Sequence, residues 1–250
     1  MRERPLSNVP KSALSLLVLA FCAQLAWHFT QPTVSAKAEN LMPPPSLPTL
    51  RLAAFGEPIA FSKLSMLYLQ AFDNQAGVQR AFQQLDYVQV EAWLARTIAL
   101  DPQSQYPLFA ASQLYAEVKD EPKQRRMLDF IYQQFLLDPN HRWKALAHAT
   151  SLARHRLKDL PLAQKYAQAI RLHATAPEVP SWAKQMEIFL LEDMNELEHA
   201  RILLGGLLQS GQIKDPHEFK FLEQRLIGLE KAQAATNQTR KQTPSPVTTP

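Results

Sequence analysis

Apolar residues recur at the spacing of one helix face along most of the chain. Between residues 58 and 216 they repeat at i, i+3, i+4 and i+7, and helix stops separate the periodic stretches. The segment 105–117, for example, places Leu108, Ala111 and Leu114 on one side. The pattern predicts four antiparallel helix pairs, with helices over residues 59–72, 87–100, 105–117, 122–137, 142–156, 161–173, 181–192 and 196–209.

A proline returns near the end of each helix pair, at Pro102, Pro139, Pro177 and Pro216. The intervals are 37, 38 and 39 residues (102 to 139, 139 to 177, 177 to 216). A period in this range, with helical patterning between the marks, is typical of stacked helix pairs. One pair cannot bury its apolar face alone, so its neighbours must stack on it. The sequence therefore predicts an all-α fold, an antiparallel helix-pair solenoid of about four repeats.

Two further features recur with the same period. A Lys-Asp-x-Pro turn stands at residues 119–122 and again at 158–161, and aspartate and proline both suit the start of a helix. A large ring marks the same place in successive first helices, at Tyr106, Trp143 and Trp182. We expect these rings to fill the core between repeats.

A family resemblance appears in the second helices and in one first helix. Glu-Ala-Trp-Leu-Ala-Arg-Thr-Ile-Ala-Leu-Asp-Pro, from Glu91 to Pro102, resembles the second helix of a tetratricopeptide repeat, as does the segment 127–139. The Trp-x-x-Leu-Ala motif at 143–147 resembles the first-helix motif of that family. The resemblance covers residues 58–216, with a period longer than the family's. It implies a right-handed superhelix whose inner groove is lined by first helices and binds peptides or proteins.

With Trp143 aligned to that motif, the resemblance places His141, Lys144, His148 and Ser151 on the groove side, where they could bind acidic groups of a peptide. The alternative is a solvated polar face. His141, His148 and His155 also recur at seven-residue spacing, but two helical turns separate successive imidazoles by about 10.5 Å. Ligands of one metal lie within about 2.1 Å of it. We therefore expect no metal site.

A second apolar stretch lies near the N-terminus. Residues 12–29 contain no acid, lysine or arginine, and three bases precede them. The length and the charge bias predict a transmembrane signal-anchor, with residues 1–11 in the cytoplasm and the rest of the chain across the membrane. Three alternatives stay open: cleavage after the small-x-small motif at 36–38, a lipoprotein box ending at Cys22, and a buried N-terminal helix of a soluble protein.

The remaining segments complete the predicted organisation. The proline-rich residues 30–57 predict an extended linker. The repeat domain then spans residues 58–231 and ends in an amphipathic capping helix at 218–231. The polar residues 232–250 predict a disordered tail.

Composition narrows the possible functions. The chain has 250 residues, of which 46% are hydrophobic, so one domain with flanking segments fits. It has only 6 glycines and no glycine-rich phosphate loop, and we expect no cofactor. The ends of the chain hold seven of the 27 bases and one of the 23 acids, which leaves 20 bases against 22 acids in residues 39–230. This near-neutral middle gives no support to nucleic-acid binding.

One acidic run offers candidate catalytic chemistry. Glu192, Asp193 and Glu196 flank the turn of the fourth pair, and paired carboxylates do acid–base work when a pocket raises one pKa. Capping of the next helix by Asp193 or Asn195 is the simpler interpretation. We therefore predict a non-catalytic scaffold or adaptor that binds a protein or peptide partner, anchored in the inner membrane with a periplasmic domain. The alternative is an envelope enzyme, such as a cell-wall hydrolase.

Overall fold

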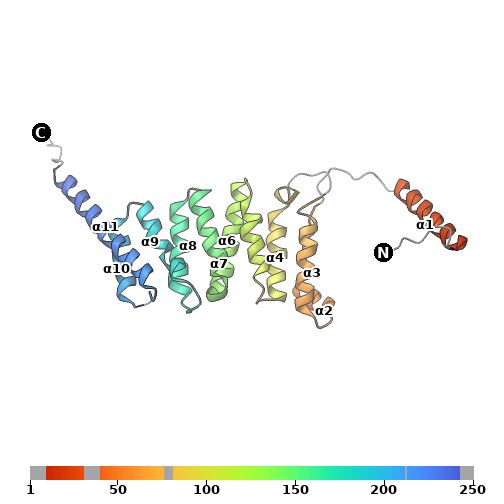
Figure 1. Ribbon diagram of the computed structural model, residues 1–250, viewed down its shortest axis with the longest axis horizontal. Coiled ribbons are helices and arrows are strands. Elements are labelled where there is room, and N and C mark those ends of the chain that lie inside the picture. The colour runs from red at the N-terminus through yellow and green to blue at the C-terminus, as the bar shows by residue number, and fades with distance from the viewer. Residues whose placement is uncertain (1–9, 31–39, 76–80, 212, 243–250) are drawn as a thin grey trace, which may run out of the picture.

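The protein is built from helices that lie side by side in chain order. The computed structural model describes residues 10–30, 40–75, 81–211 and 213–242, and within these ranges it contains no β-strand. Figure 1 shows the helices from α3 to α9 side by side in chain order, with α11 running at a slant across the far end of the row. The elements are α1 (Lys11–Thr30), α2 (Leu47–Ala53), α3 (Pro58–Ala71), η2 (Ala81–Gln83), α4 (Tyr87–Leu100), α5 (Tyr106–Gln113), η3 (Tyr115–Glu117), α6 (Glu121–Leu137), α7 (Pro139–His155), α8 (Leu160–His173), α9 (Ser181–Asp193), α10 (Leu197–Gln209) and α11 (Pro216–Gln242).

The all-α class and the predicted helices are confirmed. Each of the eight predicted segments contains a helix whose ends lie within a few residues of the expected ones. The main difference is in the segment 105–117, where α5 ends at Gln113 and the 3₁₀ helix η3 follows. Two short elements, α2 and η2, were not predicted.

The aspartates of the recurring turns cap the helices that follow them. Asp120 accepts a hydrogen bond from the Lys123 N–H at 3.1 Å, and Asp159 accepts one from the Leu162 N–H at 3.0 Å. Proline stands in the first turn of both helices, where its missing donor is not needed. The Lys-Asp-x-Pro turns therefore act as the helix starts that the sequence predicts.

The helices from α4 to α9 form two ranks. In one rank α5 packs against α7, and the rings of Trp143 on α7 and Trp182 on α9 meet edge to face at 5.4 Å. In the other rank Tyr132 on α6 stacks on Tyr166 of α8 at 5.3 Å. Each helix also packs against its neighbours in the sequence, as in the α6–α7 and α7–α8 contacts. The apolar core lies between the ranks.

Two buried clusters make up this core. The larger joins apolar side chains from Leu41 to Leu190, and the smaller joins Ile188, Leu191 and residues of α10 and α11. Leu222 and Leu229 of α11 are buried in the smaller cluster. Helix α11 thus covers the apolar side of α10.

The burial of the three recurring rings, Tyr106, Trp143 and Trp182, differs from the prediction. Trp143 is buried as expected, but Tyr106 and Trp182 are about half exposed. Trp182 meets the Trp143 ring edge to face and leaves about half of its own surface in solvent. Only the middle ring is therefore a core residue, and the other two present an aromatic surface to solvent.

The N-terminal helix α1 stands apart from the row (Figure 1). All its residues are exposed, and it is long and apolar enough to cross a membrane, although a signal sequence shares these properties. Its bounds, Lys11–Thr30, agree closely with the predicted 12–29.

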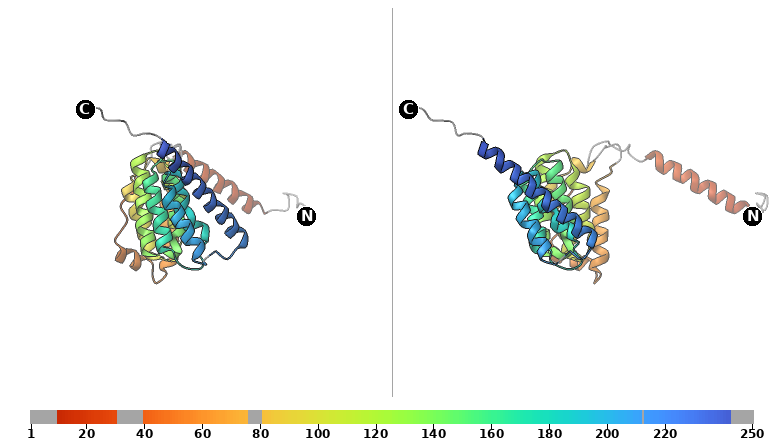
Figure 2. Two further views of the ribbon diagram at one scale, coloured as in Figure 1. Left: turned by 90° about the vertical axis from the view of Figure 1, so that its left-hand side faces the viewer. Right: turned by 60° about the vertical axis from the view of Figure 1, so that its left-hand side comes forward.

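The structure differs from the extended linker expected over residues 30–57. Leu41 is buried in the larger cluster, the Met42 carbonyl accepts a hydrogen bond from Trp93 Nε1 at 2.8 Å, and α2 buries Leu50. Apolar residues between the prolines thus attach this stretch to α3 and α4. At the other end, α11 continues to Gln242, into the tail predicted to be disordered (Figure 2). The predicted tail's last residues, 243–250, and the cleavage motif at 36–38 lie outside the described residues.

Candidate functional site

The outward surfaces of α5, α7 and α9 form a continuous face, which we call the first-helix face. These three helices neighbour one another through the α5–α7 packing, the Trp143–Trp182 contact and an ion pair of 2.5 Å between Arg154 on α7 and Asp193 on α9. The face carries aromatic and basic side chains from successive repeats: Tyr106, Phe109, His141, Lys144, Ser151 and Trp182.

The four predicted binding residues lie on one stripe of α7. His141, Lys144 and Ser151 are exposed, and His148 is partly buried. The His141 Nδ1 lies 2.9 Å from Asp138 Oδ1, and the Lys144 ammonium sits over the Trp143 ring at 5.8 Å from its centroid. The structure therefore brings these residues to a common surface, and Lys144 is the one whose charge is free of an acidic partner among the described residues.

His148 differs from the other three in its surroundings. Its Nε2 is buried without a hydrogen bond among the described residues and lies 3.6 Å from Glu117 Oε1, which is beyond hydrogen-bond distance. Glu117 pairs instead with Arg156. Burial lowers the pKa of His148, which disfavours the charged imidazolium at this position.

Aromatic side chains are the feature of this face that sequence reasoning missed. The exposed fractions are 46% for Tyr106, 58% for Phe109 and 52% for Trp182. Large rings half in solvent and grouped on one surface commonly mark contact sites for other molecules. The available signal was the helical spacing of Tyr106 and Phe109, which puts them on the side of α5 opposite Leu108 and Ala111.

The opposite surface, formed by α4, α6 and α8, has a different chemistry. Its charges pair between neighbouring helices: Arg126 with Glu91 at 2.8 Å and Arg125 with Asp159 at 2.8 Å. The Lys165 ammonium lies over the Tyr132 ring at 4.4 Å. We call this the second-helix face. The four charged side chains of these ion pairs already have partners within the chain, so they offer less to a binding molecule.

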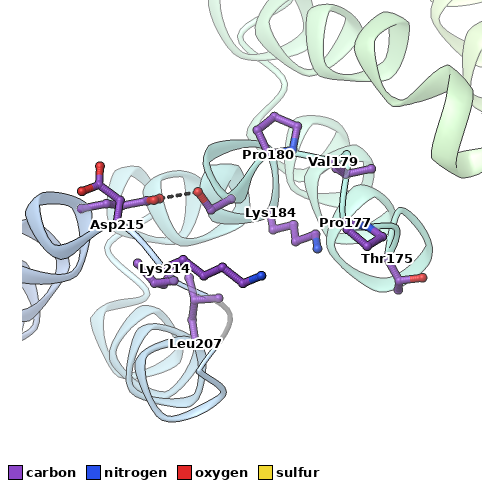
Figure 3. Close-up of a pocket in the computed structure, with 11 residues that line it drawn as sticks. Thr175, Pro177, Val179, Pro180, Lys184, Leu207, Lys214 and Asp215 are labelled. Atoms are coloured by element: carbon purple, nitrogen blue, oxygen red, sulfur yellow. Dashed lines mark hydrogen bonds between the residues drawn. The ribbon is translucent and has the colours of Figure 1, made fainter.

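A cavity of about 440 Å³ lies where the α8–α9 loop approaches the start of α11. Figure 3 shows the amino groups of Lys184 and Lys214 pointing into it, and neither pairs with an acid among the described residues. Glu218 accepts hydrogen bonds of 2.5 Å from Ser181 and Gln185. The two ammonium groups could receive a carboxylate. No residue of α7 lines this cavity, so it is separate from the predicted stripe.

Two residues of the acidic run pair with other helices, and the third pairs locally. Glu192 accepts a hydrogen bond of 2.8 Å from Arg225 Nε, Asp193 pairs with Arg154, and Glu196 lies 3.2 Å from His199. The expected capping by Asp193 or Asn195 is wrong, because the residue before α10 is Glu196 and its side chain makes no capping bond. Within the described ranges, no group of histidine, cysteine and acidic residues could hold a metal ion.

One carboxyl group outside the first-helix face has an unusual environment. Asp73, just after α3, accepts hydrogen bonds of 2.9 Å on both oxygens from the Tyr115 hydroxyl. Burial raises the pKa of Asp73 to about 6, although this hydrogen bond opposes the rise. The Tyr115 ring is fully buried, and its backbone carbonyl accepts from Tyr87. This cluster links the end of α3 to η3.

Asp73 should make the stability depend on pH. A carboxyl whose folded pKa is about 6 and whose ordinary value is 3.8 binds its proton more tightly in the folded state. Its contribution to the free energy of unfolding therefore falls as the pH rises from about 4 to about 6 and is constant above that. Asp73→Asn should gain stability over the native chain across this interval, as measured by urea unfolding at several pH values. The exposed Asp129→Asn is the control, and an equal, pH-independent difference for both variants would contradict the assignment.

Comparisons of this chain with protein-family models, with curated proteins and with solved structures found no match. The tetratricopeptide resemblance thus remains a prediction, and function has to be inferred from the surfaces themselves.

Proposed function

We propose that this protein is a non-catalytic, membrane-tethered scaffold that binds a protein or peptide partner on its first-helix face. In this proposal the four helix pairs stack as a tetratricopeptide-like solenoid, and α1 anchors them. The N-terminus lies in the cytoplasm and the repeats lie across the inner membrane, in the periplasm of a bacterial envelope. A tether of this kind raises the local concentration of the domain for partners at the same membrane.

The contrast between the two faces is the observation that carries the proposal. The first-helix face exposes Tyr106, Phe109 and Trp182, and on it Lys144 has no acidic partner among the residues that the structure describes. On the second-helix face Arg125, Arg126 and Lys165 are already engaged by Asp159, Glu91 and the Tyr132 ring. Partly buried aromatic and cationic side chains supply most of the energy of protein interfaces, so the first-helix face is the better docking surface.

Contacts between equivalent positions support the stacked arrangement. Trp143 and Trp182, the aligned rings of two successive first helices, touch each other. The equivalent turns are capped alike by Asp120 and Asp159. When one unit is carried onto the next by a regular step, equivalent residues meet in this way.

The side chains of the first-helix face also indicate what kind of partner it binds. Exposed rings favour apolar or aromatic side chains, and Lys144 favours a carboxylate. The ammonium groups of Lys184 and Lys214, which pair with no acid in the described part of the chain, add a second place for an acid near the C-terminal end of the row. We therefore expect an extended segment that carries apolar and acidic residues.

Photo-crosslinking in cells tests this proposal. A benzoylphenylalanine at position 109 replaces one exposed ring by another and should yield a discrete adduct with one protein. The reversal Lys144→Glu should reduce its yield several-fold, because the charge that receives the partner's acid is inverted.

Position 133 provides the matched control, because Gln133 is exposed on α6 of the second-helix face. We expect little or no adduct from it. The absence of any adduct from position 109, or equal adducts from both positions, would contradict the proposal.

A further inference from the structure

The N-terminal end of the row exposes an apolar surface formed by α2, α3 and the turn between them. Phe55 is 94% exposed and Leu52 is 80% exposed. The outward side of α3 adds three large aliphatic side chains, each more than half exposed. These three are Ile59, Leu64 and Leu67. We call the five residues the apolar end face.

Helix α3 is apolar on nearly every side. Its inner side buries Met66 and Leu69 against α4, as the core requires. Its outer side should be polar in a protein that ends freely in water, since the end units of helix arrays need a polar outer surface to stay soluble. Here that side carries Ile59, Leu64 and Leu67 with a single charge, Lys63. Something other than water is therefore expected to cover it.

Charge and chain length identify the covering. The charged residues around the apolar end face are Arg51 and Lys63, against one acid, Glu57. Only residues 31–40 separate the end of α1 from Leu41, where the chain enters the core. Ten residues span at most about 35 Å. A bilayer that holds α1 is thus always within reach of α2 and α3.

We infer that the apolar end face lies in the headgroup region of the same membrane that holds α1, with α3 parallel to the bilayer plane. Surface helices of this kind bury their apolar side about 5–10 Å into the boundary between headgroups and acyl chains. Lys63 and Arg51 then extend toward the lipid phosphates while their stems stay in apolar surroundings. This inference rests on the anchoring role of α1 in the proposed function.

The consequence for the proposed function is geometric. A domain held at two places, by α1 and by α3, has a fixed orientation relative to the membrane. The row of helices then extends away from the bilayer from its N-terminal end, and the first-helix face stays open along its length. A flexible tether alone would not fix that direction.

Spin-label accessibility in nanodiscs of phosphatidylethanolamine and phosphatidylglycerol tests the inference with the full chain. Single cysteines replace Phe55 or Leu67 in a Cys22→Ser background, and Ser151→Cys on exposed α7 is the control. We expect labels at positions 55 and 67 to collide more often with oxygen, which partitions into lipid, than with a water-soluble nickel chelate. The label at 151 should show the opposite order.

A charge variant sharpens the test. Leu64→Glu combined with Leu67→Glu alters exposed positions only, so the fold should persist. It should shift the label at 55 to several-fold higher nickel accessibility. Phe219→Glu with Phe221→Glu is the matched pair at the far end of the row, also exposed, and should leave that label unchanged.

Two results would overturn the inference. If the nickel chelate reaches labels at positions 55 and 67 as readily as the label at 151, the apolar end face is open to water. Shielding from both reagents, with magnetic coupling between labels on two chains, means that a second copy covers the face. If either result is found while benzoylphenylalanine at position 109 still captures its partner, the lipid contact is wrong but the proposed scaffold function stands. If the chain does not insert into nanodiscs, both the anchoring role of α1 and the lipid contact of the apolar end face are wrong.

Discussion

Replacing Arg171 by methionine should lower the free energy of unfolding by about 3–5 kcal/mol, because the change leaves a buried carboxylate without its partner. Arg171 on α8 donates to Glu187 on α9 at 2.6 Å, and the Glu187 side chain is only 3% exposed. Arg171 is the only hydrogen-bond partner of that carboxylate among the described residues. Urea unfolding followed by circular dichroism measures the loss. The double variant Arg171→Met with Glu187→Met should recover most of it.

Arg126→Met provides the comparison. Arg126 pairs with Glu91 at a similar distance, 2.8 Å, and also joins neighbouring helices, but both side chains are well exposed. Exposed ion pairs contribute about 0–1 kcal/mol, so this variant should be nearly neutral. Equal losses for Arg171→Met and Arg126→Met would show that the burial of Glu187 in the interface between α8 and α9 is wrong.

Truncation of Phe135 to alanine should cost about 3–5 kcal/mol, the range for removing a large buried ring. Phe135 lies on α6 and is fully buried in the larger core cluster. Loss of its ring leaves a cavity in the core that the neighbouring helices cannot fill without moving. Chemical unfolding of the intact chain in detergent micelles measures this effect.

Phe109→Ala separates stability from binding. Phe109 is more than half exposed on the first-helix face, so its truncation should change the free energy of unfolding by no more than about 0.5 kcal/mol. It should nonetheless reduce crosslinking from a neighbouring benzoylphenylalanine at position 106 several-fold. A loss of stability similar to that of Phe135→Ala would assign Phe109 to the core and remove it from the binding face.

The helices could be predicted because local chemistry determines them. Apolar residues at helical spacing mark the buried sides, and Asp120 and Asp159 mark the starts of α6 and α8 by capping free N–H groups. These signals act within a few residues of each other. The same holds for α1, whose length and apolar composition are visible in the sequence.

Features that depend on contacts distant in sequence could not be predicted. The Trp93–Met42 hydrogen bond joins residues 51 positions apart and holds part of the expected linker against α4. Trp143 and Trp182 occupy equivalent places, yet only Trp143 is buried, because the sequence does not tell how far each ring lies from its neighbour. Helical spacing alone places Phe109 on the side of α5 opposite Leu108, but its position next to α7 depends on contacts distant in sequence.

Crosslinking from three successive first helices tests most directly whether the first-helix face binds one extended partner. Benzoylphenylalanine is placed in turn at Tyr106 on α5, Ser151 on α7 and Trp182 on α9, and mass spectrometry maps each adduct. We predict that all three positions capture the same polypeptide, at sites that follow one another along its sequence in the order of the helices. Three unrelated proteins, or no adducts at any of the three positions, would contradict a shared binding face.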